Sequence, residues 1–87
     1  MQSADLADFV ASAIASICEI DKSEIAYNTN LLDLQMDSLS LVALVSQLEA
    51  AYEVQFSADD VMELLEPARF ADLLTAAEAL IRRYSGN

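Results

Sequence analysis

The sequence contains no histidine, and it has only one glycine, one proline and one cysteine among its 87 residues. Without histidine the commonest general base at neutral pH is missing, and a single glycine leaves no glycine-rich loop that would cradle a phosphate. The scarcity of glycine and proline also argues against an all-β fold, which needs a turn about every 8–12 residues. These absences argue against an enzyme and favour a helical protein.

Basic residues are scarce as well. Four Lys and Arg stand against fifteen Asp and Glu, which gives a net charge of −11. Such a surface repels nucleic acid and anionic lipid, because both need positive side chains to displace counterions. It suits a partner with a basic docking patch, although the charge would also serve solubility alone. The apolar stretches are short, and the N-terminus carries acids where a signal peptide carries Lys or Arg, so we expect a cytoplasmic protein without a membrane segment.

The single cysteine and the acidic clusters do not indicate a metal site. Cys18 has no partner for an intramolecular disulfide, and the lack of histidine excludes the usual zinc clusters. We interpret Cys18 as a half-buried small hydrophobe near the end of a helix. Asp59, Asp60 and Glu63 lack the pattern of a calcium-binding loop and are typical of a negatively charged helix start. We therefore predict neither a metal site nor a catalytic residue.

Apolar residues recur at helical spacing in four segments. In the first, at about residues 3–18, steps of three and one place the apolar side chains on one continuous face. A second helix begins near Ser38, a short third helix covers about residues 58–65, and a fourth carries the same pattern from Phe70 to Tyr84.

Each of these helices must bury its apolar face. The sequence therefore predicts an all-α four-helix bundle, with three long helices and one short one, in a single domain over residues 1–87. The predicted core joins the first, second and fourth helices through Phe9, Ile14, Leu44, Leu48, Phe70, Leu74 and Leu80.

Between the first and second helices, residues 19–36 break the helical period. A connection this long is unusual in a compact domain and is more often functional than not. Scattered apolar residues predict that the loop packs down on the core; they are Ile20, Ile25, Leu31, Leu32 and Leu34.

The loop meets the second helix at Met36-Asp37-Ser38-Leu39. By itself Asp-Ser is an ordinary helix start, with Asp37 as the N-cap. Here it stands at the end of a long anchored loop, inside an acidic four-helix domain. That context favours a functional interpretation of Ser38.

From about Leu31 to Ile81 the chain resembles the acyl and peptidyl carrier proteins. The family pattern is a leucine, typically a glycine, one variable residue and Asp-Ser-Leu, and this sequence reads Leu34-Gln35-Met36-Asp37-Ser38-Leu39. The resemblance implies that Ser38 carries a covalent 4'-phosphopantetheine arm, whose thiol holds an acyl or aminoacyl group as a thioester. The implied partners are a phosphopantetheinyl transferase, a loading ligase or transferase, and downstream biosynthetic enzymes. The resemblance also implies a non-catalytic protein, which we expect to be a monomer.

The residues agree with that role on physical grounds. A carrier needs a hydroxyl that is exposed yet held on a rigid element, and its partner enzyme supplies the activation, so no base is needed. The phosphodiester would lie beside the N–H groups that open the second helix. Asp37 would oppose the phosphate slightly, but it would help to recruit a basic transferase.

Two features depart from the family pattern. Gln35 replaces the usual glycine, so the loop before Asp37 lacks a residue free to take a positive φ. The second helix also carries few of the acids that fatty-acid carriers show there. We therefore favour a specialised biosynthetic pathway, and we expect a discrete protein because the chain starts and stops close to its outer helices.

The scarcity of acids on the second helix predicts how partners dock. We expect an apolar contact around Met36, Leu39 and Val42, close to the arm and to Asp37. Charged residues at the start of the third helix, Asp59 and Asp60, would steer the partner from the rim.

Two rival interpretations remain open. The chain would also suit an acidic helical interaction domain without a prosthetic group, which docks on or inhibits a partner. A small enzyme working through carboxylates such as Asp33 and Asp37 is the weaker alternative, because histidine is absent and glycine is scarce.

Overall fold

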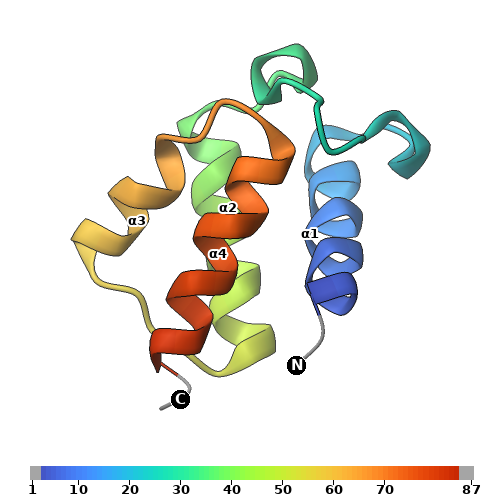
Figure 1. Cartoon of the computed structure of the whole chain (residues 1–87). Helices are drawn as coiled ribbons and strands as arrows, with labels where there is room; N and C mark the ends of the chain where they lie inside the picture. The colour runs from blue at the N-terminus through green and yellow to red at the C-terminus, as the bar shows by residue number, and fades with distance from the viewer. Residues whose placement is uncertain (1–2, 85–87) are drawn as a thin grey trace.

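The computed structural model describes residues 3–84, and the structural statements below concern that part of the chain. In chain order its elements are α1 (Ser3–Cys18), the short 3₁₀ helices η1 (Lys22–Glu24) and η2 (Leu31–Leu34), α2 (Ser38–Tyr52), α3 (Ala58–Leu65) and α4 (Phe70–Tyr84). Three long helices and a short one, with a long loop between α1 and α2, confirm the predicted all-α bundle (Figure 1). No helix in the described range is long and apolar enough to cross a membrane.

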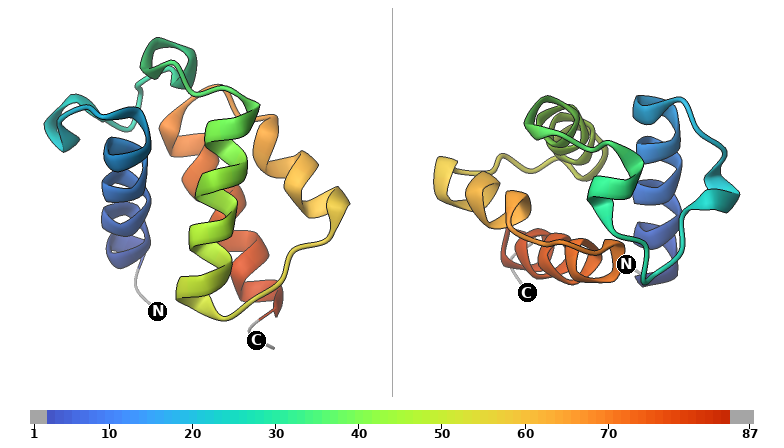
Figure 2. Two further views of the ribbon diagram at one scale, coloured as in Figure 1. Left: turned by 180° about the vertical axis from the view of Figure 1, so that it is seen from behind. Right: turned by 90° about the horizontal axis from the view of Figure 1, so that it is seen from above.

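The helices are arranged as a ring. α1 packs against α2 and α4, and α3 packs against the same two helices from the other side. The view from above in Figure 2 shows α1 and α3 at opposite sides of the molecule, with α2 and α4 between them. α3 is therefore held mainly by its contacts with α2 and α4.

The predicted core residues mostly lie in the interior. Ile14, Leu44, Leu48, Phe70 and Leu80 are buried. Phe9 and Leu74 are only half-buried at the edge of the core. The core also includes apolar residues from α1, the long loop, the connection between α2 and α3, α3 and α4; they are Leu6, Val10, Leu31, Leu34, Met36, Phe56, Leu64, Leu73, Ala77 and Ile81.

The long loop packs on the core through fewer residues than predicted. Leu31 and Leu34 are buried, and Ile20 and Ile25 are half-buried. The prediction is wrong for Leu32, which is 77% exposed. The reason is the 3₁₀ geometry of η2, in which residues three apart share a side, so Leu31 and Leu34 face inward while Leu32 faces out.

The loop also caps the start of α4 through backbone hydrogen bonds. The N–H of Phe70 donates to the carbonyl of Thr29 (3.0 Å), and the N–H of Ala71 donates to the carbonyl of Tyr27 (2.9 Å). A third bond runs the other way, from the N–H of Leu31 to the carbonyl of Ala68 (2.8 Å). Helix-start N–H groups have no partner within their own helix, so these bonds fasten the loop and α4 to each other.

Candidate functional site

Ser38 is the first residue of α2, and it is exposed. Asp37 is the N-cap, as predicted: its backbone is extended, and its carboxylate accepts a hydrogen bond from the N–H of Ser40 (2.8 Å). This hydrogen bond from Ser40 is the largest cause that lowers the pKa of Asp37 below its ordinary value of 3.8. Ser38 therefore sits at a well-capped helix start, next to a carboxylate that stays ionised at neutral pH.

The backbone before Ser38 turns at Gln35. This residue is in the left-handed conformation, with φ 60° and ψ 32°, and its N–H donates to the carbonyl of Leu32 (3.0 Å). The position thus adopts the positive φ that glycine favours even though a glutamine occupies it, at a cost of about 1 kcal/mol. The sequence showed that Gln35 replaces the usual glycine. The structure shows that this glutamine nevertheless takes the positive φ of a left-handed turn.

The predicted role of Met36 in the docking surface is wrong. Its side chain is only 4% exposed, and its sulfur lies 3.4 Å from the sulfur of Cys18 at the end of α1. The left-handed turn at Gln35 directs the next residue toward the core, so Met36 anchors the end of the loop. A buried side chain cannot take part in docking.

Cys18 is half-buried, as predicted. Burial is the main cause that raises the pKa of its thiol above the ordinary value of 9.0, and the negative charge of Asp37 raises it further. The thiol stays protonated at neutral pH, and a protonated thiol is a poor nucleophile.

Leu39 and Val42 remain on the surface of α2. Leu39 is 81% exposed and Val42 is 48% exposed. They lie three residues apart, so they share one face of the helix, within its first two turns after Ser38. The structure therefore brings two of the three predicted apolar docking residues together near the candidate site.

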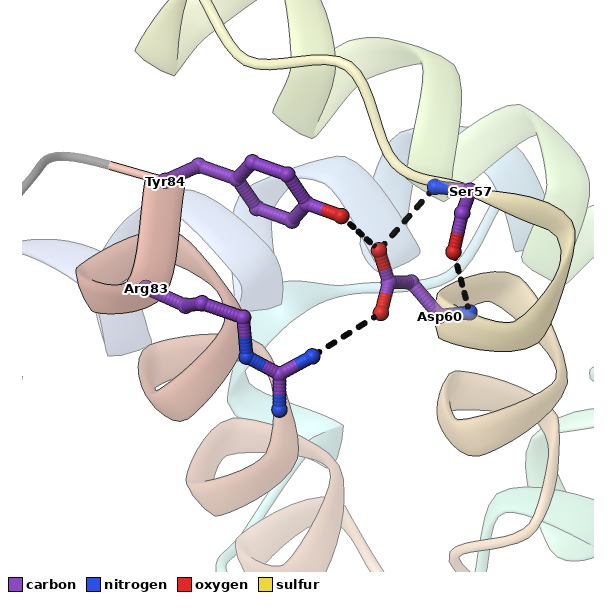
Figure 3. Close-up of polar contacts among 4 residues, drawn as sticks. All are labelled: Ser57, Asp60, Arg83 and Tyr84. Atoms are coloured by element: carbon purple, nitrogen blue, oxygen red, sulfur yellow. Dashed lines mark hydrogen bonds and ion pairs between the residues drawn. The ribbon is translucent and has the colours of Figure 1, made fainter.

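The predicted role of Asp60 as a steering charge is also wrong. Asp59 is exposed, but the side chain of Asp60 is only 3% exposed and points toward the end of α4 (Figure 3). It cannot serve as a steering charge on the rim. The burial of a carboxylate in the first turn of α3 is explained by its partners.

Those partners form a polar group that we call the Asp60 cluster, made of Ser57, Asp60, Arg83 and Tyr84 (Figure 3). The Asp60 carboxylate accepts hydrogen bonds from the N–H of Ser57 (3.0 Å), from Arg83 Nη1 (3.2 Å) and from the Tyr84 hydroxyl. In return the N–H of Asp60 donates to Ser57 Oγ (3.2 Å), which completes a capping box at the start of α3. The local Ser57-x-x-Asp60 spacing was visible in the sequence, but the partners on α4 were not.

The Asp60 cluster predicts a pH dependence. The hydrogen bond from Tyr84 is the largest cause that lowers the pKa of Asp60, followed by that from the Ser57 backbone, and the charge of Arg83 also contributes. A lowered folded pKa means that the stabilisation is fully present above the ordinary value of 3.8 and is lost as the pH falls through the folded pKa. In denaturant melts, wild type should therefore be more stable than Asp60→Asn at neutral pH, and this difference should vanish in acid. A difference that persists below the folded pKa would contradict the role of the ionised carboxylate.

The candidate site is an exposed surface position, away from the two best-formed pockets of the described residues. Two pockets of about 360 and 290 Å³ lie between α1, the loop and α4, and both are lined by Ala7 and Tyr27. Ser38 lines neither of them. Within residues 3–84 there is also no group of three or more His, Cys, Asp or Glu that could hold a metal ion.

The sequence profile of the family described as the phosphopantetheine attachment site matches residues 8–74. The chain belongs to this family. A non-reducing polyketide synthase of Emericella nidulans, pkiA, is 31% identical over 77 residues, which make up 88% of this chain and 3% of the synthase. The chain thus spans only a small part of the length of this curated relative. No solved structure matches the chain.

Family membership fixes the general role of the protein. It is a phosphopantetheine carrier, with 4'-phosphopantetheine as its covalent cofactor. Such a carrier interacts with the phosphopantetheinyl transferase that attaches the arm and with the synthase enzymes that use it.

Proposed function

We propose that the carrier bears its arm on Ser38 and presents an acyl group to the enzymes of a specialised biosynthetic pathway, as a discrete monomer in the cytoplasm. The observation that supports Ser38 is its position. It is an exposed hydroxyl on the first residue of a long helix, directly after the N-cap Asp37.

The helix start fits a phosphodiester. The N-terminus of a helix presents N–H groups and a partial positive charge, both of which favour a phosphate. Ser40 and Ser46 lie further along α2, where the backbone N–H groups are used by the helix or by Asp37. Ser38 is therefore the serine of α2 at which the attached phosphate gains most from the helix.

The protein's own residues position the serine that would bear the arm, and the arm supplies the thiol that carries an acyl group as a thioester. Asp37 fixes the start of α2, and Leu31, Leu34 and Met36 anchor the loop that precedes it. Cys18 keeps its proton and does not compete with the arm for the acyl group. Activation of the Ser38 hydroxyl is left to the transferase.

The choice of pathway draws support from two observations. The relative in Emericella nidulans is a polyketide synthase, which favours acyl over aminoacyl cargo. The first turn of α2 contains no acidic residue, so an enzyme that recognises acids on this helix would find few of them. We therefore favour a polyketide type of acyl group.

The direct test is the mass of the wild-type protein. After co-expression with a promiscuous phosphopantetheinyl transferase, intact-mass spectrometry should show the addition of one phosphopantetheine, and fragmentation should locate it on Ser38. A protein that stays unmodified would support the rival interpretation, an acidic interaction domain without a prosthetic group.

We further propose that partners dock on an apolar surface formed by Leu39 and Val42, with Asp37 beside it, and that the exposed charge of Asp59 on α3 steers their approach. Val42→Asp places a charge where the partner would exclude water, and burying an unpaired charge is costly. We expect this variant to lower the kcat/KM of acyl loading by about tenfold or more, at low and at high salt alike.

Two further variants make the test specific. Ala51→Asp adds the same charge at an exposed position near the other end of α2 and should leave loading almost unchanged. Asp59→Lys reverses an exposed charge, so its effect should appear in the association rate and fade at high salt. Normal loading of Val42→Asp would show that partners do not use this surface.

A further inference from the structure

The short helix α3 is held in the bundle by little apolar packing. Leu64 is its only fully buried apolar side chain, with Val61 and Leu65 half-buried beside it. By contrast α2 buries four apolar side chains and α4 buries five. Elements with few buried apolar contacts are the ones that open locally at the lowest free energy. The position of α3 must therefore depend on other interactions.

The remaining buried residue of α3 is Asp60, and its contacts lead out of the helix. One oxygen of the carboxylate pairs with Arg83 and the other accepts the Tyr84 hydroxyl, both in the last turn of α4. The same carboxylate closes the capping box with Ser57. A hydrogen bond with a charged partner is stronger than a neutral one, and burial of this carboxylate shields it from water.

The segment that leads into α3 is fixed at the same place. The ring of Tyr84 packs against Phe56, with ring centroids 5.9 Å apart. The N–H of Phe56 donates to the carboxylate of Glu49 on α2 (2.8 Å). The start of α3 is therefore fastened to both neighbouring helices, and Figure 3 shows the α4 side of this arrangement.

We propose that the Asp60 cluster links α3 to the last turn of α4 and holds the short helix in one position beside α2, so that loss of the link lets α3 open while the three long helices stay folded. Figure 1 shows that the last turn of α4 lies at the end of the bundle away from the loop that precedes α2. The cluster is thus separate from the candidate attachment site. Its effect is conformational: it fixes where the exposed residues of α3, such as Asp59 and Met62, stand relative to α2.

Amide hydrogen exchange of the full chain tests the link, read helix by helix. Tyr84→Phe is the most informative variant, because it removes one hydroxyl from α4, keeps the ring against Phe56 and changes no residue of α3. We expect the amides of residues 61–65 to exchange about tenfold faster or more in Tyr84→Phe, Arg83→Gln and Asp60→Asn, with much smaller changes in the core amides of α1, α2 and α4.

Two matched controls separate the link from simpler effects. Asp59→Asn removes the same charge from the same turn of α3, but from an exposed side chain outside the cluster. Arg82→Gln removes the neighbouring base of α4, which pairs with Glu78 instead. Both controls should leave exchange in α3 close to that of wild type.

Each outcome of the exchange experiment either supports the link or contradicts it. Faster exchange confined to α3 in the variants on α4 supports the link. Faster exchange in Asp60→Asn alone would mean that Asp60 acts only as part of its own helix cap, and the proposal would be wrong. An equal increase in all four helices, or no increase in any variant, would also overturn it.

Discussion

Replacement of Ser38 by alanine is expected to abolish attachment of phosphopantetheine. The variant lacks the hydroxyl of the first residue of α2, and Ser40, the other serine of the first turn, is half-buried and lies two residues further along. Because Ser38 is not the N-cap and makes no buried contact, its loss should change the free energy of unfolding by less than about 0.5 kcal/mol. Intact mass after co-expression with the transferase measures the first effect, and a denaturant melt measures the second.

Two matched serines give the controls. Ser40→Ala and Ser46→Ala make the same chemical change further along α2 and should be modified as completely as wild type. If Ser38→Ala gained the arm while a control variant lost it, the attachment site would lie elsewhere on the helix. If Ser38→Ala failed to fold, the melt would reveal it, and Ser38→Cys, which keeps the size of the side chain, would replace it in the mass measurement.

The largest loss of stability is expected for Leu48→Ala. Leu48 is fully buried on α2, inside the core that joins the helices. Removing a leucine side chain from such a site forfeits its transfer free energy and leaves a cavity, so the free energy of unfolding should fall by about 2–5 kcal/mol. A chain of this size has a small free energy of unfolding, so this loss should lower the melting temperature by several degrees or more.

The same helix offers the control for Leu48. Leu39→Ala deletes the same atoms from a side chain that is 81% exposed, so it should cost less than about 0.5 kcal/mol. A loss of that small size for Leu48→Ala as well would show that the inward face of α2 is assigned wrongly. Leu39→Ala has a second use, since it should still lower loading if partners dock on this surface.

The sequence predicted those features of the fold that depend on neighbours in the chain. Helical spacing located the four helices with their approximate ends, because each buried face repeats within one helix. The cap at Asp37 was predictable for the same reason, since a cap and the N–H that it accepts lie three residues apart. The exposure of Leu39 and Val42 also followed from their place on the helix.

Other features depend on backbone geometry or on distant residues. Met36 and Leu32 are both apolar loop residues, and the sequence placed Met36 on the docking surface and Leu32 against the core, both wrongly. The turn at Gln35 buries the first, whereas the 3₁₀ geometry of η2 exposes the second. The burial of Asp60 requires Arg83 and Tyr84, more than twenty residues further along the chain. No local pattern reports that contact.

The cap that the loop provides for α4 has a consequence for the order in which the chain becomes functional. The hydrogen bonds from Phe70 and Ala71 to the carbonyls of Thr29 and Tyr27 join segments that are far apart in the sequence. Forming such contacts requires closure of a long stretch of chain, which is slow compared with the formation of a single helix. During synthesis the loop before Ser38 cannot complete these contacts until the start of α4 has left the ribosome. The transferase therefore meets a fully ordered attachment segment only after nearly the whole domain has been made.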